Sequence, residues 1–454
     1  MTVIREELRT SQKAIVDVFS NRSLRRIFAA FAGSLIGDGV FALSAAVYAY
    51  RTGGPTAVGV LAVIRYVAIA TIAPFASTLV DQYSRKRVMI ASDIARLVLV
   101  TIAAILVSLH APKWYVYLLV VVVGMAGTAF RPAQASILPS LSREHDEVAG
   151  SNVVSSTIES VGFFAGPAIA GFLLAFSNIA TAFTFDAITF VWSALLVASV
   201  RPLSPEEQAP ELAALRSTVD AATIASEPFL VRAMQGFRAI RADREVRTLV
   251  ILYILQCVVA GASAVFTIAV ALRLLHIGTS GLGLMESTLG IGGLIGGFIA
   301  LLLMSRARLA ADFAIGVMVW SAPLLLIAII PNLGAALVSM WLIGAANSLV
   351  DVNAITVLQH IVPNETLGRV LGALEAGEVG GMALGSLAMT LLIHVIGLRP
   401  GLALIGGAIT LAVIPGLPAM HRIDARSAVT GPVRPPSSAH AHLHPHRLRL
   451  RHTR

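Results

Sequence analysis

The chain has 454 residues, of which 56% are hydrophobic and only 13% charged, and its mean hydropathy is +0.81. A soluble fold of this length would not need so many apolar residues, so the composition excludes a water-soluble protein and predicts one embedded in lipid. The net charge of +9 is expected on a membrane face next to anionic lipid, and it indicates no nucleic-acid partner.

The first 26 residues are rich in charge and lack the pattern of a cleavable signal peptide, so they are expected to form a cytoplasmic lead-in. Twelve apolar stretches follow, each long enough to cross a membrane as a helix. They are residues 27–50, 56–80, 88–109, 115–138, 148–176, 179–200, 246–275, 281–304, 310–330, 334–361, 367–396 and 400–417. The sequence therefore predicts an all-α membrane protein with twelve transmembrane helices.

The basic residues predict the orientation of these helices. Of the 34 Lys and Arg residues, all but seven fall in segments that would be cytoplasmic if the N-terminus is inside. The other seven lie near outer ends (Arg51, Lys113, Arg273, Arg399) or inside spans (Arg65, Arg96, Arg131). We therefore expect a multi-pass protein of the cell membrane with both termini in the cytoplasm.

One long segment, residues 201–245, divides the spans into an N-terminal bundle (27–200) and a C-terminal bundle (246–417). The second half of this linker mixes basic and large apolar residues, which is typical of an amphipathic helix on the inner membrane surface, and a solvated connector is the alternative. The tail, residues 418–454, is rich in His, Arg and Pro and is expected to be a disordered cytoplasmic segment. Its histidine run, at positions 440, 442, 444 and 446, could bind a transition metal adventitiously, and disorder without a specific ligand is the alternative. No metal site or cofactor is predicted, because no clustered metal ligands occur within the expected folded region.

Residues 224 positions apart coincide at corresponding helix boundaries, which indicates an internal repeat. Gly54 coincides with Gly278, Gly59 with Gly283 and Pro139 with Pro363. Together with the division into six and six spans, this pattern predicts two pseudo-symmetric bundles built from one six-helix unit.

Two motifs carry a family resemblance. In the charged run between the second and third spans, Leu79, Asp81, Arg85 and Lys86 agree with the signature of the major facilitator superfamily of secondary transporters, while Ser77, Gln82 and Ser84 depart from it. In the fifth span, Gly162, Gly166, Pro167 and Gly171 resemble the helix-bend motif of its exporter branch, and Ala170 departs from a double glycine. Small residues and proline would also suit generic helix packing.

Further residues narrow the resemblance to the drug and macrolide efflux branch, which also includes bacterial siderophore exporters: Gly37, Asp38, Pro132, Ala133, Leu138 and Pro139. The resemblance implies a drug:proton antiporter that works by alternating access, with a small amphiphilic substrate and protons as its partners. Membrane lipids are further expected partners, and the protein is expected to be a monomer. A dedicated siderophore or lysolipid transporter is one alternative, and a sensor or scaffold that has lost transport is another. The sequence has no phosphate-binding loop and no catalytic triad, so no enzyme is predicted.

The resemblance also implies a cytoplasmic gate at the charged run, formed by Asp81, Arg85, Lys86 and Arg87. A carboxylate at this place could stabilise the positively polarised start of the eleventh span, near Thr366, while the basic residues hold the inner surface. The whole run, residues 81–87, is expected to be a tight hairpin turn.

Proton coupling requires an ionisable group within the membrane, because a carboxylate is costly there in its charged form and can exchange a proton near neutral pH. Asp38 is the candidate, about 18 Å along the first span at 1.5 Å per residue, and a buried structural aspartate is the alternative reading of it. Asp93 and Arg96, three residues apart, are expected to form a local ion pair. The other candidate intramembrane charges, for which structural ion pairs are the alternative, are Arg65, Arg131, Glu159, Asp186, Asp351, Glu375 and Glu378.

Overall fold

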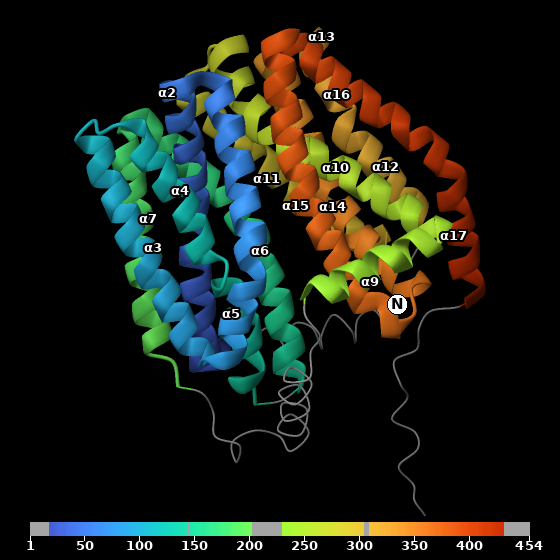
Figure 1. The fold of residues 1–454 in the computed structure, drawn as a ribbon, viewed down its shortest axis with the longest axis horizontal. Helices are drawn as coiled ribbons and strands as arrows, with labels where there is room; N and C mark the ends of the chain where they lie inside the picture. The colour runs from blue at the N-terminus through green and yellow to red at the C-terminus, as the bar shows by residue number, and fades with distance from the viewer. Residues whose placement is uncertain (1–17, 144, 202–228, 304–307, 431–454) are drawn as a thin grey trace, which may run out of the picture.

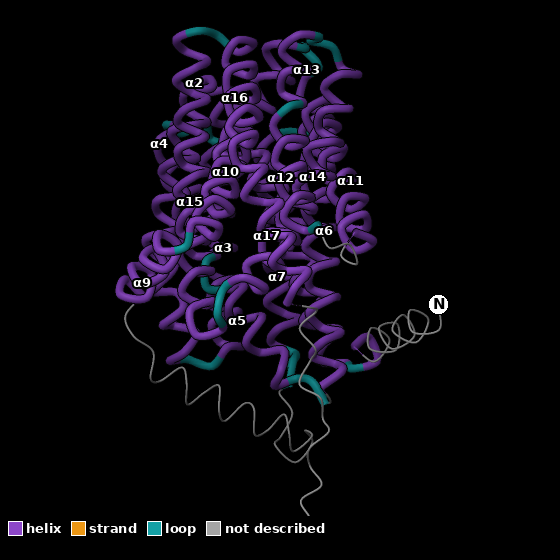
Figure 2. Tube along the Cα trace, turned by 90° about the vertical axis from the view of Figure 1, so that its right-hand side faces the viewer, coloured by secondary structure: helices purple, strands orange, loops and turns teal. Residues whose placement is uncertain are grey.

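The computed structural model describes residues 18–143, 145–201, 229–303 and 308–430, and for a few of these, Asp81 among them, it describes the backbone alone. Every regular element within these ranges is a helix (Figure 2). Two bundles lie side by side: the N-terminal half, blue to green in Figure 1, and the C-terminal half, yellow-green to red. The expected lead-in up to residue 17, most of the linker and the histidine run of the tail lie outside the described residues.

The first long helix of the N-terminal bundle begins at a polar cap and is interrupted at a glycine. The side chain of Asn21 accepts hydrogen bonds from the first backbone N–H groups of the long helix α2 (Arg22–Gln82). This helix contains the first two predicted spans and joins them at Gly54, whose φ of 66° suits glycine. The bundle continues with α3 (Arg85–Ser108), α4 (Lys113–Gly127), α5 (Phe130–Ile137), the 3-10 turn η1 (Leu138–Ser140), α6 (His145–Phe176) and α7 (Ile179–Ala198).

The C-terminal bundle follows the linker helix α9 (Phe229–Ala242), which packs on α15. Asp243 and Asn332 cap the starts of α10 and α14 with their side-chain oxygens. The elements are α10 (Arg244–Ala269), the π-helical turn η3 (Val270–Leu274), α11 (Gly278–Leu303), α12 (Leu309–Ser321), α13 (Pro323–Ile329), α14 (Leu333–Ile361), α15 (Asn364–Val395), α16 (Leu398–Val413), η4 (Ile414–Gly416) and α17 (Leu417–Thr430).

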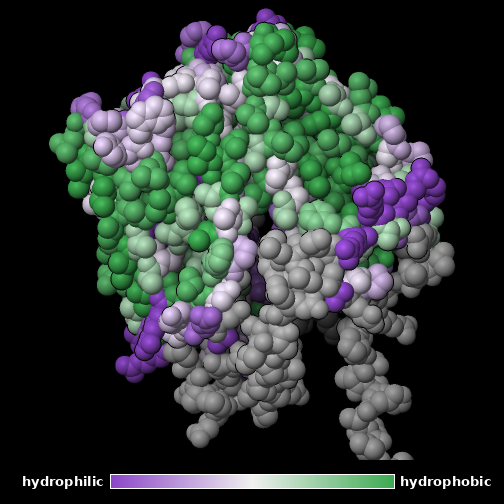
Figure 3. Space-filling model, viewed as in Figure 1, coloured by the Kyte–Doolittle hydropathy of each residue, from purple (hydrophilic) through white to green (hydrophobic). Residues whose placement is uncertain are grey.

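The number of membrane-spanning helices follows from length and hydropathy. Ten stretches of the described chain are long and apolar enough to span a membrane, and the first of them contains the two helices joined at Gly54. The second half of α6 is a shorter apolar helix, Ala165–Phe176, and completes the set of twelve spans. Large apolar side chains cover much of the outside of both bundles (Figure 3), as expected of a surface that contacts lipid.

The structure corrects the predicted hairpin at residues 81–87. Helix α2 continues through Asp81 to Gln82, and α3 already begins at Arg85. Tyr83 and Ser84 between them have extended backbone conformations, and the carbonyl oxygen of Ser84 accepts hydrogen bonds from the N–H groups of Arg87 and Val88 at the start of α3. The turn is therefore two residues long, and most of the charged run belongs to the two helix ends.

The structure also corrects the start of the predicted disordered tail. Helix α17 occupies residues 417–430, because Met420 and Ile423 are fully buried against the C-terminal bundle. The Asp424 carboxylate accepts hydrogen bonds from the backbone N–H groups of Ala310 and Ala311, at 2.8 and 3.0 Å, and so caps the start of α12. A segment judged polar by composition is thus ordered by tertiary contacts.

The two halves meet at one end of the molecule, near the positive-φ residues Gly54 and Gly278 (φ 66° and 70°). There α2 packs on α15, where Gly59 lies against Thr390, and α6 packs on α11. The Thr279 hydroxyl donates a hydrogen bond of 3.3 Å to the carbonyl oxygen of Leu174 in the opposite half. Away from this contact a hollow is visible between the bundles (Figure 3). Among the described residues, the close backbone contact between the halves therefore lies towards the Gly54 end.

Candidate functional site

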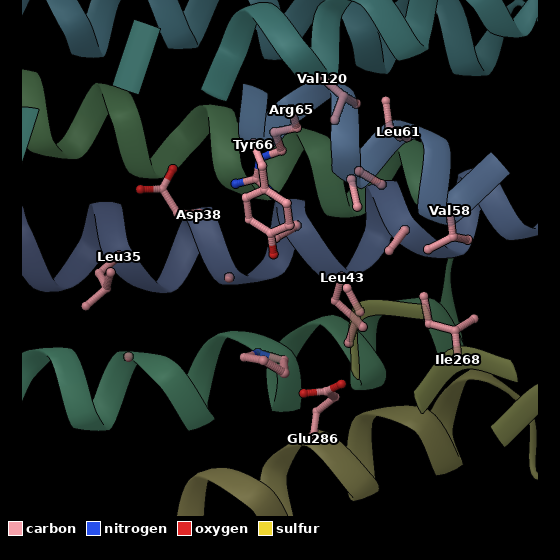
Figure 4. A pocket seen from close by; sticks show the side chains of 18 of the residues that line it. Leu35, Asp38, Leu43, Val58, Leu61, Arg65, Tyr66, Val120, Ile268 and Glu286 are labelled. Atoms are coloured by element: carbon pink, nitrogen blue, oxygen red, sulfur yellow. The ribbon is translucent and has the colours of Figure 1, made fainter. Parts of the chain in front are cut away.

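A cavity of about 550 Å³ lies between the two halves (Figure 4). Its walls are formed mainly by α2, with further residues from α4, α5 and α6 and, on the opposite side, from α10 and α11. Apolar side chains dominate this lining, and a volume of this size suits a small molecule. A second cavity of about 360 Å³ extends into the C-terminal half and shares Tyr66, Ala264 and Glu286 with the first.

Asp38 lines the central cavity and belongs to an ion-pair network. Arg96 on α3 donates hydrogen bonds to both carboxylate oxygens of Asp38, at 3.1 and 3.0 Å, and to Asp93 at 2.7 Å. The Ser193 hydroxyl of α7 donates to the other oxygen of Asp93, at 2.7 Å. The predicted local pair of Asp93 and Arg96 is confirmed.

The members of this network differ in exposure. The side chain of Asp38 is 43% exposed, whereas those of Arg96 and Asp93 are 3% and 0% exposed. Arg96 is further held by two aromatic rings, because its guanidinium lies 4.2 Å from the ring centre of Phe190 and 4.9 Å from that of Phe130. Asp38 is therefore the member of the network that the cavity can reach, and the other two form its buried support.

Asp186 on α7 is fully buried behind Asp38 and does not line the cavity. One of its oxygens accepts a hydrogen bond from the Thr189 hydroxyl at 3.3 Å, and its other oxygen has no partner among the described residues. Both side chains pack against the backbone of Gly37, where an added Cβ would collide with them. The glycine before Asp38 thus allows α2 and α7 to approach closely.

Two further arginines lie on the same side of the cavity. Arg65 on the second segment of α2 lines it close enough to Asp38 for electrostatic attraction. Arg131 on α5 forms an ion pair with Glu159 on α6, in which the side chains are 65% and 38% exposed. The N-terminal wall of the cavity therefore pairs its carboxylates with arginines.

The C-terminal wall is organised differently, around neutral hydrogen-bond donors. Asn347 on α14 accepts hydrogen bonds from Gln256 and from Trp320, both at 3.0 Å, and donates one of 3.0 Å to Asp351. The Tyr253 hydroxyl lies 3.4 Å from Asp351 and 3.5 Å from Glu378, and so can donate to either carboxylate. Asp351 and Glu378 both line the second cavity.

Glu375 and Glu378, which share a face of α15 in the sequence pattern, occupy different surroundings. Glu378 lines the second cavity, while Glu375 is exposed and lies outside the lining of both cavities. Side chains three residues apart on an α-helix point in directions that differ by about 60° around the helix axis. This difference is enough to place Glu378 in the cavity lining and Glu375 outside it.

Glu286 on α11 is the cavity residue that the sequence reasoning missed. It lines both cavities, and among the described residues its carboxylate has no hydrogen-bond or ion-pair partner. Its position inside the apolar stretch 281–304 could have identified it, since any carboxylate inside a span is a candidate site. The many glycines of this span, however, suggest a helix whose role is close packing, and they drew attention away from its carboxylate.

The predicted gate residues lie at the far end of the N-terminal bundle from Gly54. Lys86 donates hydrogen bonds of 2.7 Å to the carbonyl oxygens of Ala198 and Val200 at the end of α7, in its own half. Arg85 and Arg87 lie in the first turn of α3, and Arg87 is exposed. The side chain of Asp81 lies outside the described residues, so its expected contact with α15 remains a prediction.

The helix-bend motif of α6 lies at two close helix contacts. An added Cβ at Gly162 would collide with Leu35, and one at Gly166 with the backbone of Gly39, both on α2. At Gly171 it would collide with the backbone of Gly283, on α11 of the other half. The motif thus packs α6 against α2 along its length and against the opposite half at its end.

Comparisons with known proteins agree with this architecture. Two macrolide efflux A proteins of Streptococcus pyogenes are 27% identical over 180 residues, which are 38% of this chain and 44% of each relative. The chain thus spans less than half the length of these relatives in the alignment. A transporter of Bacillus subtilis (strain 168) described as the uncharacterized MFS-type transporter YfiS is 26% identical over 331 residues, covering 70% of this chain and 73% of that protein.

Solved structures share the fold at low sequence identity. A POT family transporter in complex with a thioalcohol-conjugated peptide has a TM-score of 0.69 and 14% identity, covering 88% of this chain and 96% of that one. A point mutant of the nucleoside transporter NupG has a TM-score of 0.70 and 12% identity, covering 88% and 100%. The sequence profile of the Major Facilitator Superfamily matches residues 27–313, more than half of the chain. The chain is a member of the major facilitator superfamily.

Proposed function

We propose that this membrane transporter is a proton-coupled exporter of small amphiphilic molecules, and that Asp38 is its proton-carrying residue. Membership of the superfamily makes the chain a multi-pass secondary transporter and not an enzyme. The similarity to the macrolide efflux proteins supports export of an amphiphile. The observation that carries the proposal is the Asp38–Arg96–Asp93 network, in which one carboxylate faces the cavity and shares its arginine with a buried one.

Because Asp38 and Asp93 share Arg96, protonation of Asp38 changes how the helices are held together. While Asp38 is charged, Arg96 holds it by two hydrogen bonds. When Asp38 takes up a proton, this attraction weakens, and Asp93 alone still compensates the charge of Arg96 inside the bundle. Protonation therefore loosens α2 from α3 without leaving a buried charge unpaired.

The position of Asp38 links this change to the contact between the halves. Its neighbour Gly39 lies against Gly166 of α6, and five residues further along α6 Gly171 lies against Gly283 of the opposite half. A shift of α2 next to α6 is therefore transmitted to the closed end of the molecule through packed backbone. This chain of contacts supports alternating access driven by the proton.

The observed state suits the uptake step of an exporter. The halves are in contact at the Gly54 end, which the distribution of basic residues assigns to the outside, and the cavity lies on the other side of that contact. In this orientation a substrate enters from the cytoplasm or inner leaflet, and both termini are cytoplasmic.

The test measures proton movement in inside-out membrane vesicles with erythromycin as a macrolide probe. For the wild type we expect erythromycin to release protons from the acidified lumen, detected as recovery of a quenched pH dye. Asp38→Asn should abolish this recovery, while Glu375→Gln, which alters an exposed carboxylate outside both cavities, should retain it. Unchanged proton movement in Asp38→Asn would overturn the assignment of the coupling residue.

A further inference from the structure

The carboxylate of Glu286 lies where the two halves face each other across the central cavity. Figure 4 shows Glu286 on α11 and Asp38 on α2, which belong to opposite halves, and the Asp38 side chain points away from α11. Glu286 also borders the second cavity, so it stands at the junction of the two spaces. A ligand in either cavity would pass or touch this side chain.

Glu286 is distinguished from the other cavity carboxylates by its lack of partners in the described structure. Asp38 is bound by Arg96, Glu159 by Arg131, Asp351 by Asn347, and Glu378 lies within reach of the Tyr253 hydroxyl. An unpaired carboxylate within the membrane is costly, so the site is incomplete without a positive partner.

The charges around Glu286 are unequally distributed between the two walls. The lining of the second cavity contains the three carboxylates Glu286, Asp351 and Glu378 and, among the described residues, no lysine or arginine. The arginines that line the central cavity, Arg65 and Arg131, come from the N-terminal half. A positive charge is therefore attracted more strongly to the C-terminal side, where the three carboxylates face no lysine or arginine of the described lining, than to the N-terminal wall, where Asp38 and Glu159 are already paired with arginines.

The other side chains that line the central cavity favour a ligand with a large apolar part. Leu43, Val58, Leu61 and Ile268 face the same central space (Figure 4). Burial of an organic group against these side chains is favourable by the hydrophobic effect, and it also excludes water from the ion pair, which strengthens it.

We infer that Glu286 binds the positively charged group of a cationic amphiphile, whose apolar part fills the central cavity between the halves. The inference rests on the proposed transport function and deepens it by naming the charge of the substrate and the residue that recognises it. Asp38 and Glu286 then have separate tasks: Asp38 exchanges protons with the Arg96 network, and Glu286 determines which solutes bind.

Binding to the purified full-length chain tests this without transport. The probes are tetraphenylphosphonium and tetraphenylborate, which have nearly the same size and shape and opposite charges, and their affinities are measured by equilibrium dialysis in detergent. We expect the wild type to bind the phosphonium and Glu286→Gln to bind it about tenfold or more weakly. Glu286→Asp should restore part of the affinity, because the charge is kept.

Two controls make the result specific. Glu375→Gln removes an exposed carboxylate from α15 and should leave phosphonium binding unchanged. Tetraphenylborate should bind the wild type no more tightly than it binds Glu286→Gln, since loss of the negative charge can only favour an anion. Thermal melting of each variant verifies that it is folded.

Equal phosphonium affinity in the wild type and Glu286→Gln would overturn the inference. Tighter binding of the borate to the wild type than to Glu286→Gln would also overturn it. This outcome is separable from failure of the proposed function. If Asp38→Asn retains normal proton movement while Glu286→Gln loses phosphonium binding, the coupling assignment is wrong and the recognition site stands.

Discussion

Arg96 joins Asp38 and Asp93 through separate nitrogens, with Nη1 on Asp38 at 3.0 Å and Nη2 on Asp93 at 2.7 Å. The planar guanidinium fits this double role, because its donors form a rigid fork that can serve two carboxylates at once. Of the three side chains only that of Asp38 is open to the cavity, whereas Arg96 and Asp93 are buried. The arrangement makes Arg96 both a structural residue and the counter-ion of the proposed proton carrier.

Removing Arg96 should destabilise the N-terminal bundle strongly. Arg96→Met leaves the fully buried Asp93 without its positive partner, and loss of one member of a buried pair costs about 3–5 kcal/mol. We expect a large fall in the melting temperature of the purified protein. The matched control is Arg131→Met, which breaks an exposed pair worth no more than about 1 kcal/mol. Equal melting of the two variants would contradict a buried role for Arg96.

The contact between Gly171 and Gly283 should control access from the Gly54 end. Gly171→Ala places a methyl group against the backbone of Gly283 and should favour states in which the halves are separated there. The readout is labelling of Ile268→Cys, in a Cys257→Ser background, by an impermeant maleimide added from outside. Faster labelling is expected. Gly380→Ala, at a position with open space around it, should not change the rate, and an unchanged rate in Gly171→Ala would argue against this closure.

Lys86 should stabilise the contact between α3 and α7 within the N-terminal bundle. Its two hydrogen bonds of 2.7 Å satisfy carbonyl groups at the end of α7, and charged hydrogen bonds of this kind contribute about 1.5–3 kcal/mol each. Partial exposure reduces that value, so Lys86→Met should lower stability by about 1–2 kcal/mol. Arg87→Met, at an exposed neighbouring position, should have little effect. If Lys86→Met altered cysteine accessibility at the cavity without lowering the melting temperature, a gating role would be favoured over a stabilising contact between α3 and α7.

Asp424 should link α17 to α12. Its carboxylate caps the first N–H groups of α12, and loss of such a cap costs about 0.5–2 kcal/mol. Asp424→Ala should therefore lower the melting temperature and increase proteolysis of the segment after Leu417. Arg422→Ala is the control, because Arg422 is exposed and its Nε hydrogen bond goes to Pro418 one turn earlier. Resistance of Asp424→Ala to both changes would indicate that α17 is held by its apolar residues alone.

Several features of this protein follow from the sequence because they depend on local properties. A membrane span is a continuous apolar stretch, so the helices and their division into six and six could be predicted from hydropathy alone. The pair of Asp93 and Arg96 was also local, since three residues on one helix place both side chains on one face. The internal repeat predicted that Gly54 and Gly278 occupy equivalent positions, and both glycines have a positive φ next to the start of a helical segment.

What required the tertiary structure were relationships between distant segments. Asp38 and Arg96 are far apart in the sequence, and hydropathy cannot say which face of each helix meets the other. Whether a carboxylate is paired is likewise decided by its neighbours in space, which separates Glu286 from Asp351 although both lie in apolar spans. The ordering of α17 also came from contacts with α12 that composition does not reveal. The sequence alone thus determined that the chain crosses the membrane as twelve helices, because lipid acts on each span separately. Only the packing of the spans decided which charges meet, and that the Glu286 carboxylate has no partner among the described residues.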